Sequence, residues 1–204
     1  PAYTASSMQA VIDSISTPFI DVSNSLARAH IDHAIGLGEY QSWQSDGERY
    51  RRLVDISPPG KAFRDALAGI RESGGAEPMY TALDQVATGS GILRPSQGRS
   101  VPADQQANWR TGTYRIIIND SDEDPDANGN DPDGPTLVAA AAHMRAKHIH
   151  HVGLQIKREL PQQAPTDSAL NSQSQALSNH LRRLSALTDT FAPSGGVDCN
   201  GDGR

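Results

Sequence analysis

The sequence is poor in cysteine, in aromatic residues and in basic charge, and it contains no long apolar run. Cys199 is the sole cysteine among 204 residues, which excludes an internal disulfide framework and leaves the redox compartment open. A net charge of -6 argues against a nucleic-acid-binding surface. No apolar stretch reaches the roughly 20 residues that cross a bilayer. We therefore expect one globular domain with no membrane span in this piece and no nucleic-acid partner.

Motifs that would indicate catalysis are also lacking. The segment Gly89-Ser90-Gly91 does not have the Gly-x-Ser-x-Gly spacing of a nucleophile elbow. Gly36 and Gly38 lie inside an expected strand and are too few for a dinucleotide-binding fingerprint. The histidines of residues 143–151 have no cysteine pair or carboxylate spaced to complete a zinc site. The sequence gives no reason to expect an enzyme.

Apolar spacing and turn residues predict alternating helices and strands. Helices are expected at residues 7–26, 63–70, 79–89, 137–144 and 170–187. Strands are expected at residues 31–40, 50–56, 115–118 and 149–156, the first two forming a hairpin. Pro18 should kink or split the first helix. This alternation favours an α/β fold with a doubly wound, mostly parallel sheet and helices on both faces.

The most informative stretch covers residues 114–134. Ile116, Ile117 and Ile118 form a β-branched run without polar alternation, which is typical of an interior strand covered on both faces. The run breaks at Asn119-Asp120 into a loop rich in carboxylates, and ligands of open α/β sheets bind at the carboxyl ends of strands. The loop is interpreted either as a cation site or as a solvated acidic turn.

Four segments together resemble the von Willebrand factor type A (VWA) domain, in the bacterial branch that is similar to integrin β I-like domains. The resemblance spans most of the chain. Its segments are Ala5-Ser6-Ser7-Met8; Gly74-Gly75-Ala76-Glu77-Pro78 followed by Ala82-Leu83; Asn108-Trp109-Arg110 followed by the strand from Tyr114 to Asp120; and the junction from Ala146 to Gly153. It implies a Rossmann-like fold whose first strand would lie upstream of Pro1.

The resemblance also implies a metal-ion-dependent adhesion site, in which three loops at the top of the sheet hold a divalent cation. A carboxylate from a partner protein then completes the coordination. Mg²⁺ suits this role because it accepts few protein oxygens and keeps positions open for water or ligand. Carried over residue by residue, the metal ligands are Ser7, Glu77 and Asp120.

The resemblance is incomplete at the other ligand positions. Tyr3 stands where the family has the first-loop aspartate, and Ala5 stands where it has the first hydroxyl. In the second loop Ala76 replaces a threonine. The expected site is therefore degenerate, and Mg²⁺ or Ca²⁺ is its expected cofactor.

Two further segments resemble the opening of a calcium loop. Their oxygen-bearing residues alternate before a glycine, as in calcium repeats. The candidate ligands are Asp124, Asp126 and Asn128 in the first segment and Asp198, Asn200 and Asp202 in the second. In the first segment the closing bidentate acid of an EF-hand would fall on Pro135, so an EF-hand is excluded and a Gly/Asp-rich turn is the alternative.

The chain begins at Pro1 and stops at Arg204 in the middle of the second calcium-like segment, so we interpret it as a piece of a longer protein. Residues 1–192 are expected to form a VWA-like domain that is partial at its N-terminus. Residues 193–204 are expected to be a Gly/Asp-rich tail that starts a calcium-binding repeat.

The expected function is protein binding or adhesion through the loops at the carboxyl ends of the strands. The expected location is extracellular, at the cell surface or periplasmic, in a bacterium. The alternative is a metal-free structural or spacer domain of a larger extracellular protein.

Overall fold

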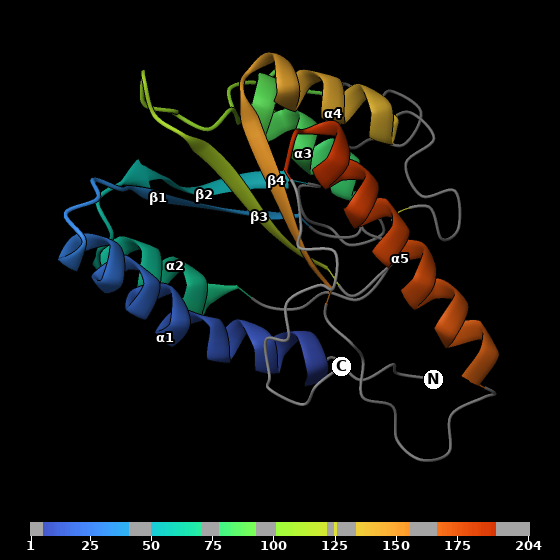
Figure 1. The fold of residues 1–204 in the computed structure, drawn as a ribbon, viewed down its shortest axis with the longest axis horizontal. Helices are drawn as coiled ribbons and strands as arrows, with labels where there is room; N and C mark the ends of the chain where they lie inside the picture. Colours follow the sequence, from blue (N-terminus) through green and yellow to red (C-terminus); the bar gives the residue numbers. More distant parts are fainter. Residues whose placement is uncertain are drawn as a thin grey trace.

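The computed structural model describes residues 6–40, 50–70, 78–92, 101–121, 125, 134–155 and 167–190. Within these residues the fold is mixed α/β, with the elements in the order shown in Figure 1. They are α1 (Ser6–Arg28), β1 (Ile35–Tyr40), β2 (Tyr50–Ser57), α2 (Lys61–Gly69), α3 (Met79–Thr88), β3 (Arg115–Ser121), α4 (Leu137–Ala146), β4 (Ile149–Gln155) and α5 (Asp167–Leu187). Of these helices, none is both long and apolar enough to cross a membrane.

The described strands form two separate two-stranded sheets. β1 and β2 pair antiparallel, from Ile35 opposite Ser57 to Tyr40 opposite Tyr50, which confirms the expected hairpin. β3 and β4 pair parallel in one uninterrupted register, from Arg115 opposite Ile149 to Ser121 opposite Gln155. The α/β class is thus confirmed, with one parallel pair. A single doubly wound sheet stays a prediction.

The helix boundaries follow from local sequence signals. α3 ends at Gly89, whose φ of 60° lies in the left-handed region where glycine carries no steric penalty. α4 begins after Thr136, whose side chain accepts a hydrogen bond from the backbone N–H of Ala139 at 3.2 Å. α1 is a single helix with Pro18 inside it, so Pro18 does not split the helix, and the kink that was expected as the other outcome stays a prediction. Loss of one backbone donor does not stop the turns on either side from continuing.

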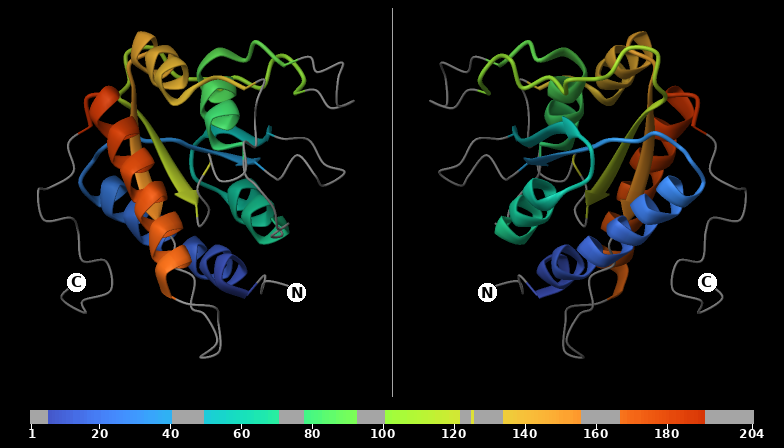
Figure 2. Two further views of the ribbon diagram at one scale, coloured as in Figure 1. Left: turned by 90° about the vertical axis from the view of Figure 1, so that its right-hand side faces the viewer. Right: turned by 90° about the vertical axis from the view of Figure 1, so that its left-hand side faces the viewer.

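The main core lies on one face of the β3–β4 pair, where α3, α4 and α5 pack together (Figures 1 and 2). Ile149 is fully buried there, and Ile117 of β3 packs against the same cluster. α5 packs closely on β4 at Gly153, where an added Cβ would lie 2.7 Å from Cδ2 of Leu181. The apolar stripe predicted for the last helix is confirmed as core packing, with Leu177, Leu181 and Leu184 buried.

The other face of the β3–β4 pair is open. Ile116 is 48% exposed, Ile118 is 45% exposed and Leu154 is 37% exposed. The expectation that the isoleucine run is covered on both faces is therefore wrong for the described residues. The physical reason is that α1 packs against α2, with the rings of Phe19 and Phe63 5.9 Å apart, and not against β3.

Gly153→Ala is expected to destabilise the fold because the new methyl group would overlap three side-chain atoms of Leu181 at 2.7–3.0 Å. Overpacking of this kind costs about 1–3 kcal/mol, which urea denaturation of the purified chain can measure. Gly69→Ala is the matched control, since nothing lies within 4 Å of its added Cβ. Equal unfolding midpoints for the two variants would contradict the close packing of α5 on β4.

Candidate functional site

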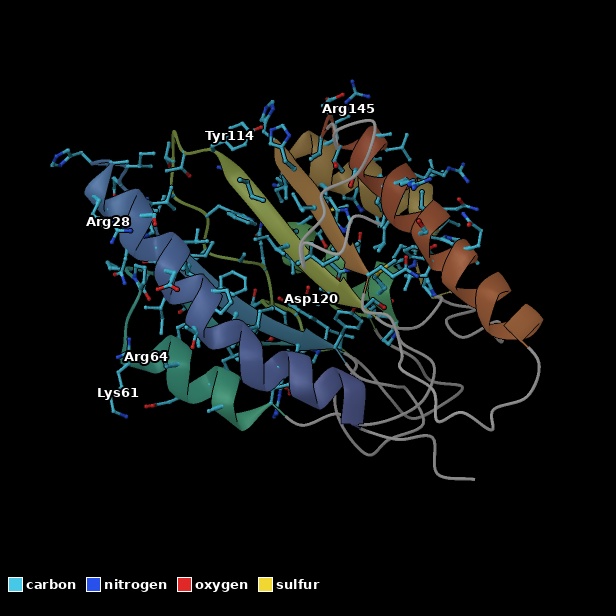
Figure 3. All side chains as sticks on the ribbon, turned by 60° about the horizontal axis from the view of Figure 1, so that its bottom comes forward. Arg28, Lys61, Arg64, Tyr114, Asp120 and Arg145 are labelled. Carbon is cyan, nitrogen blue, oxygen red and sulfur yellow. The ribbon has the colours of Figure 1, made fainter. Side chains whose placement is uncertain are left out.

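The candidate site lies at the carboxyl end of β3, where the sequence predicted a cation. Asp120 is the penultimate residue of β3, which ends at Ser121, three residues beyond the predicted end at Ile118. The hydroxyl of Tyr40, the last residue of β1, donates a hydrogen bond to the backbone carbonyl of Asp120 at 2.8 Å. Figure 3 shows Asp120 at the tip of β3. The carboxyl ends of β1 and β3 therefore meet at this site.

The start of α3 also lies at this end of the sheet. Nδ2 of Asn119 lies 3.0 Å from Sδ of Met79, the first residue of α3, and both residues are buried. The N-terminal end of α1 points to the same end of the molecule (Figures 1 and 2). The start of α3 and the ends of β1 and β3 therefore lie together, and the start of α1 lies toward the same end of the molecule.

The three predicted metal ligands are described to different degrees. Asp120 is placed in full, whereas Ser7 is placed only by its position in the first turn of α1. Glu77 lies outside the described residues, although Pro78, the N-cap of α3, is described and buried. All six residues of the calcium-like segments, namely Asp124, Asp126, Asn128, Asp198, Asn200 and Asp202, lie outside the described residues.

The carboxylate of Asp120 is half-buried on the open face of the β3–β4 pair, beside Leu154 in the register. Among the described residues, no cation or hydrogen-bond donor contacts its side chain. Burial raises the pKa of Asp120 from 3.8 to about 6, because the charged form loses hydration without gaining a partner. A bound cation would supply the missing countercharge.

Oxygen ligands at this position suit a hard divalent ion such as Mg²⁺ or Ca²⁺. Asp120 fits this requirement, as an ionisable oxygen donor at the carboxyl end of β3. In the described part of the chain, the surroundings of Asp120 included, no three His, Cys, Asp or Glu side chains lie close enough together to hold a metal ion. The ligand set therefore depends on Ser7 and Glu77.

The histidine-rich junction does not form a single cluster. Nδ1 of His143 in α4 lies 2.5 Å from Oδ1 of the buried Asp84 in α3, so this contact links the two helices. His148 precedes β4 in a left-handed conformation, with a φ of 53°. His150 stacks on Tyr114 at 4.3 Å, on the open face. His151 points into the core, where it is fully buried.

Two helix-linking pairs were missed by the sequence analysis. They are Asp84–His143, between α3 and α4, and Tyr80–His180, between α3 and α5. Asp84 is four residues from Tyr80 and therefore lies on the buried side of α3. A buried carboxylate requires a partner, so the position of Asp84 on the buried side of α3 could have predicted a partner on a neighbouring element.

Burial shifts the pKa of His151 in the direction opposite to that of Asp120. Burial lowers the pKa of His151 from 6.5 to about 4, because the core disfavours the imidazolium. Its Nδ1 lies 3.4 Å from Oγ of Ser185, while its buried Nε2 has no hydrogen-bond partner among the described residues. Protonation of His151 would place an uncompensated charge against α5.

In comparisons with known proteins, no protein-family model matches the chain, and no curated protein matches it.

Opposite pH effects of Asp120 and His151 are expected in the absence of divalent ions. The raised pKa of Asp120 contributes stability that is present below pH 4 and is lost as the pH rises through about 6. The lowered pKa of His151 contributes stability that is present above pH 6.5 and is lost as the pH falls towards 4. The two contributions offset each other between pH 4 and 6.

Asp120→Asn should remove the pH-dependent contribution of Asp120 and leave that of His151. At pH 7 the variant should be more stable than the wild type by up to about 3 kcal/mol, since the unfavourable buried charge is gone. Between pH 7.0 and pH 4.5 it should lose about 2 kcal/mol more than the wild type loses. Urea denaturation with a chelator present measures both differences. Parallel pH dependence of the two proteins would show that Asp120 is not buried in this way.

Proposed function

We propose that this chain is a protein-binding module with a VWA-like fold, which binds a carboxylate of a partner protein through a divalent cation. The supporting observation is the half-buried carboxylate of Asp120, which lies without a charged partner among the described residues at the carboxyl end of a parallel strand. Burial raises its pKa to about 6, because the charged carboxylate lacks a countercharge. A bound cation would supply that countercharge.

The arrangement of the elements supports the doubly wound form of this fold. β3 and β4 are parallel, and their carboxyl ends lie at the same end of the molecule as the starts of α1 and α3. Helix starts carry a partial positive charge and free N–H groups, so they favour an anionic ligand at this end. A secreted or surface-anchored bacterial protein is the proposed setting for such a module.

In this proposal Ser7, Glu77 and Asp120 hold the ion. The cation supplies a Lewis-acidic position at which a partner carboxylate can bind. The serine hydroxyl is a neutral ligand, so the ion keeps enough positive charge to attract that carboxylate. The chain's own residues provide the oxygens and orient them, and no covalent step is involved.

The alternative is a metal-free structural or spacer domain. The substitutions that favour it are Tyr3, Ala5 and Ala76, which stand at positions where the resemblance implies ligands. In that case the open strand ends carry no ion, and the domain only connects neighbouring segments of a larger extracellular protein.

A thermal-unfolding titration with Mg²⁺, Mn²⁺ and Ca²⁺ distinguishes these functions. An ion that binds the folded state with a Kd of about 1 mM would add about 1.4 kcal/mol at 10 mM, which raises Tm by about 3–6 °C. Asp120→Ala should abolish the shift. The shift should also weaken below pH 6, where protons compete for the carboxylate.

Asp65→Ala is the matched control, because Asp65 is an exposed carboxylate of α2 that pairs with Lys61 one turn away. It should keep the full ion-dependent shift. The absence of any shift in the wild type at 10 mM ion would favour the metal-free structural domain.

A further inference from the structure

Asp120 is held in place by contacts on several sides. In the parallel ladder with β4 it stands opposite Leu154. Its neighbours Asn119 and Ser121 are buried, so by the alternation of a strand the side chain of Asp120 points to the open face. From the side of β1, the hydroxyl of Tyr40 donates a hydrogen bond to the carbonyl of Asp120 at 2.8 Å.

Tyr40 itself belongs to a firmly placed element. It is the last residue of β1 and lies opposite Tyr50 in the antiparallel register with β2. β2 is tied to the segment that leads into β3, because the N–H of Ile56 donates to Oδ1 of Asn108 at 2.6 Å and Nδ2 of Asn108 donates to the carbonyl of Ile56 at 3.2 Å. Tyr40 packs against the main core cluster and against a second cluster that includes Tyr50. Its hydroxyl therefore reaches β3 from a fixed position.

The hydrogen bond from Tyr40 bears directly on the geometry of a cation ligand. Asp120 lies one residue before the end of β3, and the ends of elements open most readily. Rotation of the Asp120 peptide would move its carboxylate away from the other ligands, whereas Mg²⁺ demands near-ideal octahedral geometry. Tyr40 opposes that rotation, because the carbonyl that it holds and the side chain that carries the carboxylate belong to the same residue.

The ring and the hydroxyl of Tyr40 have separable roles. The ring supplies apolar packing against the two core clusters, which requires no polar group. The hydroxyl bonds the residue of β3 that carries the candidate metal-binding carboxylate. That bond joins residues 80 positions apart and links two described sheets that share no backbone ladder.

We propose that Tyr40 is a positioning residue of the cation site, which raises the affinity for the ion by holding the peptide of Asp120 in place. Tyr40 is not a ligand in this arrangement and acts through the backbone of Asp120. The bound ion in turn stabilises the contact between the β1–β2 hairpin and β3, since coupling between two binding events is reciprocal. This inference rests on the proposed cation-dependent function and identifies an element that regulates that site.

Tyr40→Phe tests the positioning role, because it removes the hydroxyl and keeps the ring. Thermal unfolding of the full chain during titration with Mg²⁺, Mn²⁺ and Ca²⁺ gives the Kd of the wild type and of the variant. The variant should bind the ion about 3- to 10-fold more weakly, which is the range that the loss of one hydrogen bond allows. Unfolding in chelator measures the ion-free stability separately, so a merely structural role would lower that stability and leave the Kd unchanged.

Tyr50→Phe is the matched control. Tyr50 is a buried tyrosine of the same hairpin and stands opposite Tyr40, but among the described residues no hydrogen bond joins it to Asp120. Tyr50→Phe should keep the wild-type Kd, whatever its ion-free stability. Equal weakening of ion binding in the two variants would overturn the positioning role.

A second measurement does not depend on the folding of a variant. In the chain labelled with meta-fluorotyrosine, saturating ion should move the fluorine resonance of Tyr40 and leave that of Tyr50 in place. A Tyr40 resonance that does not respond to the ion would overturn the inference.

The outcomes also separate this inference from the cation proposal. A wild-type response to the ion that Tyr40→Phe keeps at the same Kd would overturn the positioning role alone. Absence of any response in the wild type would overturn both.

Discussion

The packing of three helices onto one face of the β3–β4 pair is the interaction on which the rest of the structure depends. Two parallel strands are marginal by themselves, and their stability comes from burial of one apolar face. The fully buried Ile149 and the close approach of Leu181 to Gly153 fix α5 against β4. Because α3 and α4 share the same cluster, the position of each helix start relative to the strand ends follows from this one face.

Polar pairs make the helix packing specific. The Asp84–His143 pair joins α3 to α4, and the Tyr80–His180 pair joins α3 to α5. Nonspecific apolar contact would leave the helices free to slide or rotate, whereas a buried carboxylate without its partner is costly. These pairs therefore hold α3 at one rotation, and that rotation places Met79 beside Asn119 at the candidate site.

The same geometry gives the two faces of the β3–β4 pair different electrostatic roles. The covered face keeps His151 neutral, because a charge in the core has no compensation. The open face carries Asp120, which has lost hydration but has gained no partner among the described residues. Asp120, the candidate cation ligand whose side chain the structure describes, therefore lies on the side of the sheet that α3, α4 and α5 leave uncovered.

The sequence alone determined the elements that depend on local rules. The spacing of apolar residues and the positions of turn residues predicted the β1–β2 hairpin, the end of α3 at Gly89 and the buried stripe of α5. Each of these features depends on residues that lie close together in the chain. The alternation of helices and strands predicted the α/β class for the same reason. It also predicted that the strand stops before Asp120, whereas β3 continues to Ser121, so Asp120 lies inside the strand, one residue before its end.

Only the tertiary structure decided which surfaces are covered. The run Ile116 to Ile118 carries the same β-branched signal whether one face or both faces are buried, and it was α1 packing on α2 that left one face open. The histidine partners were likewise beyond the sequence, since they join residues 59 and 100 positions apart. Local propensity fixes what a segment can form, and long-range packing fixes what it contacts.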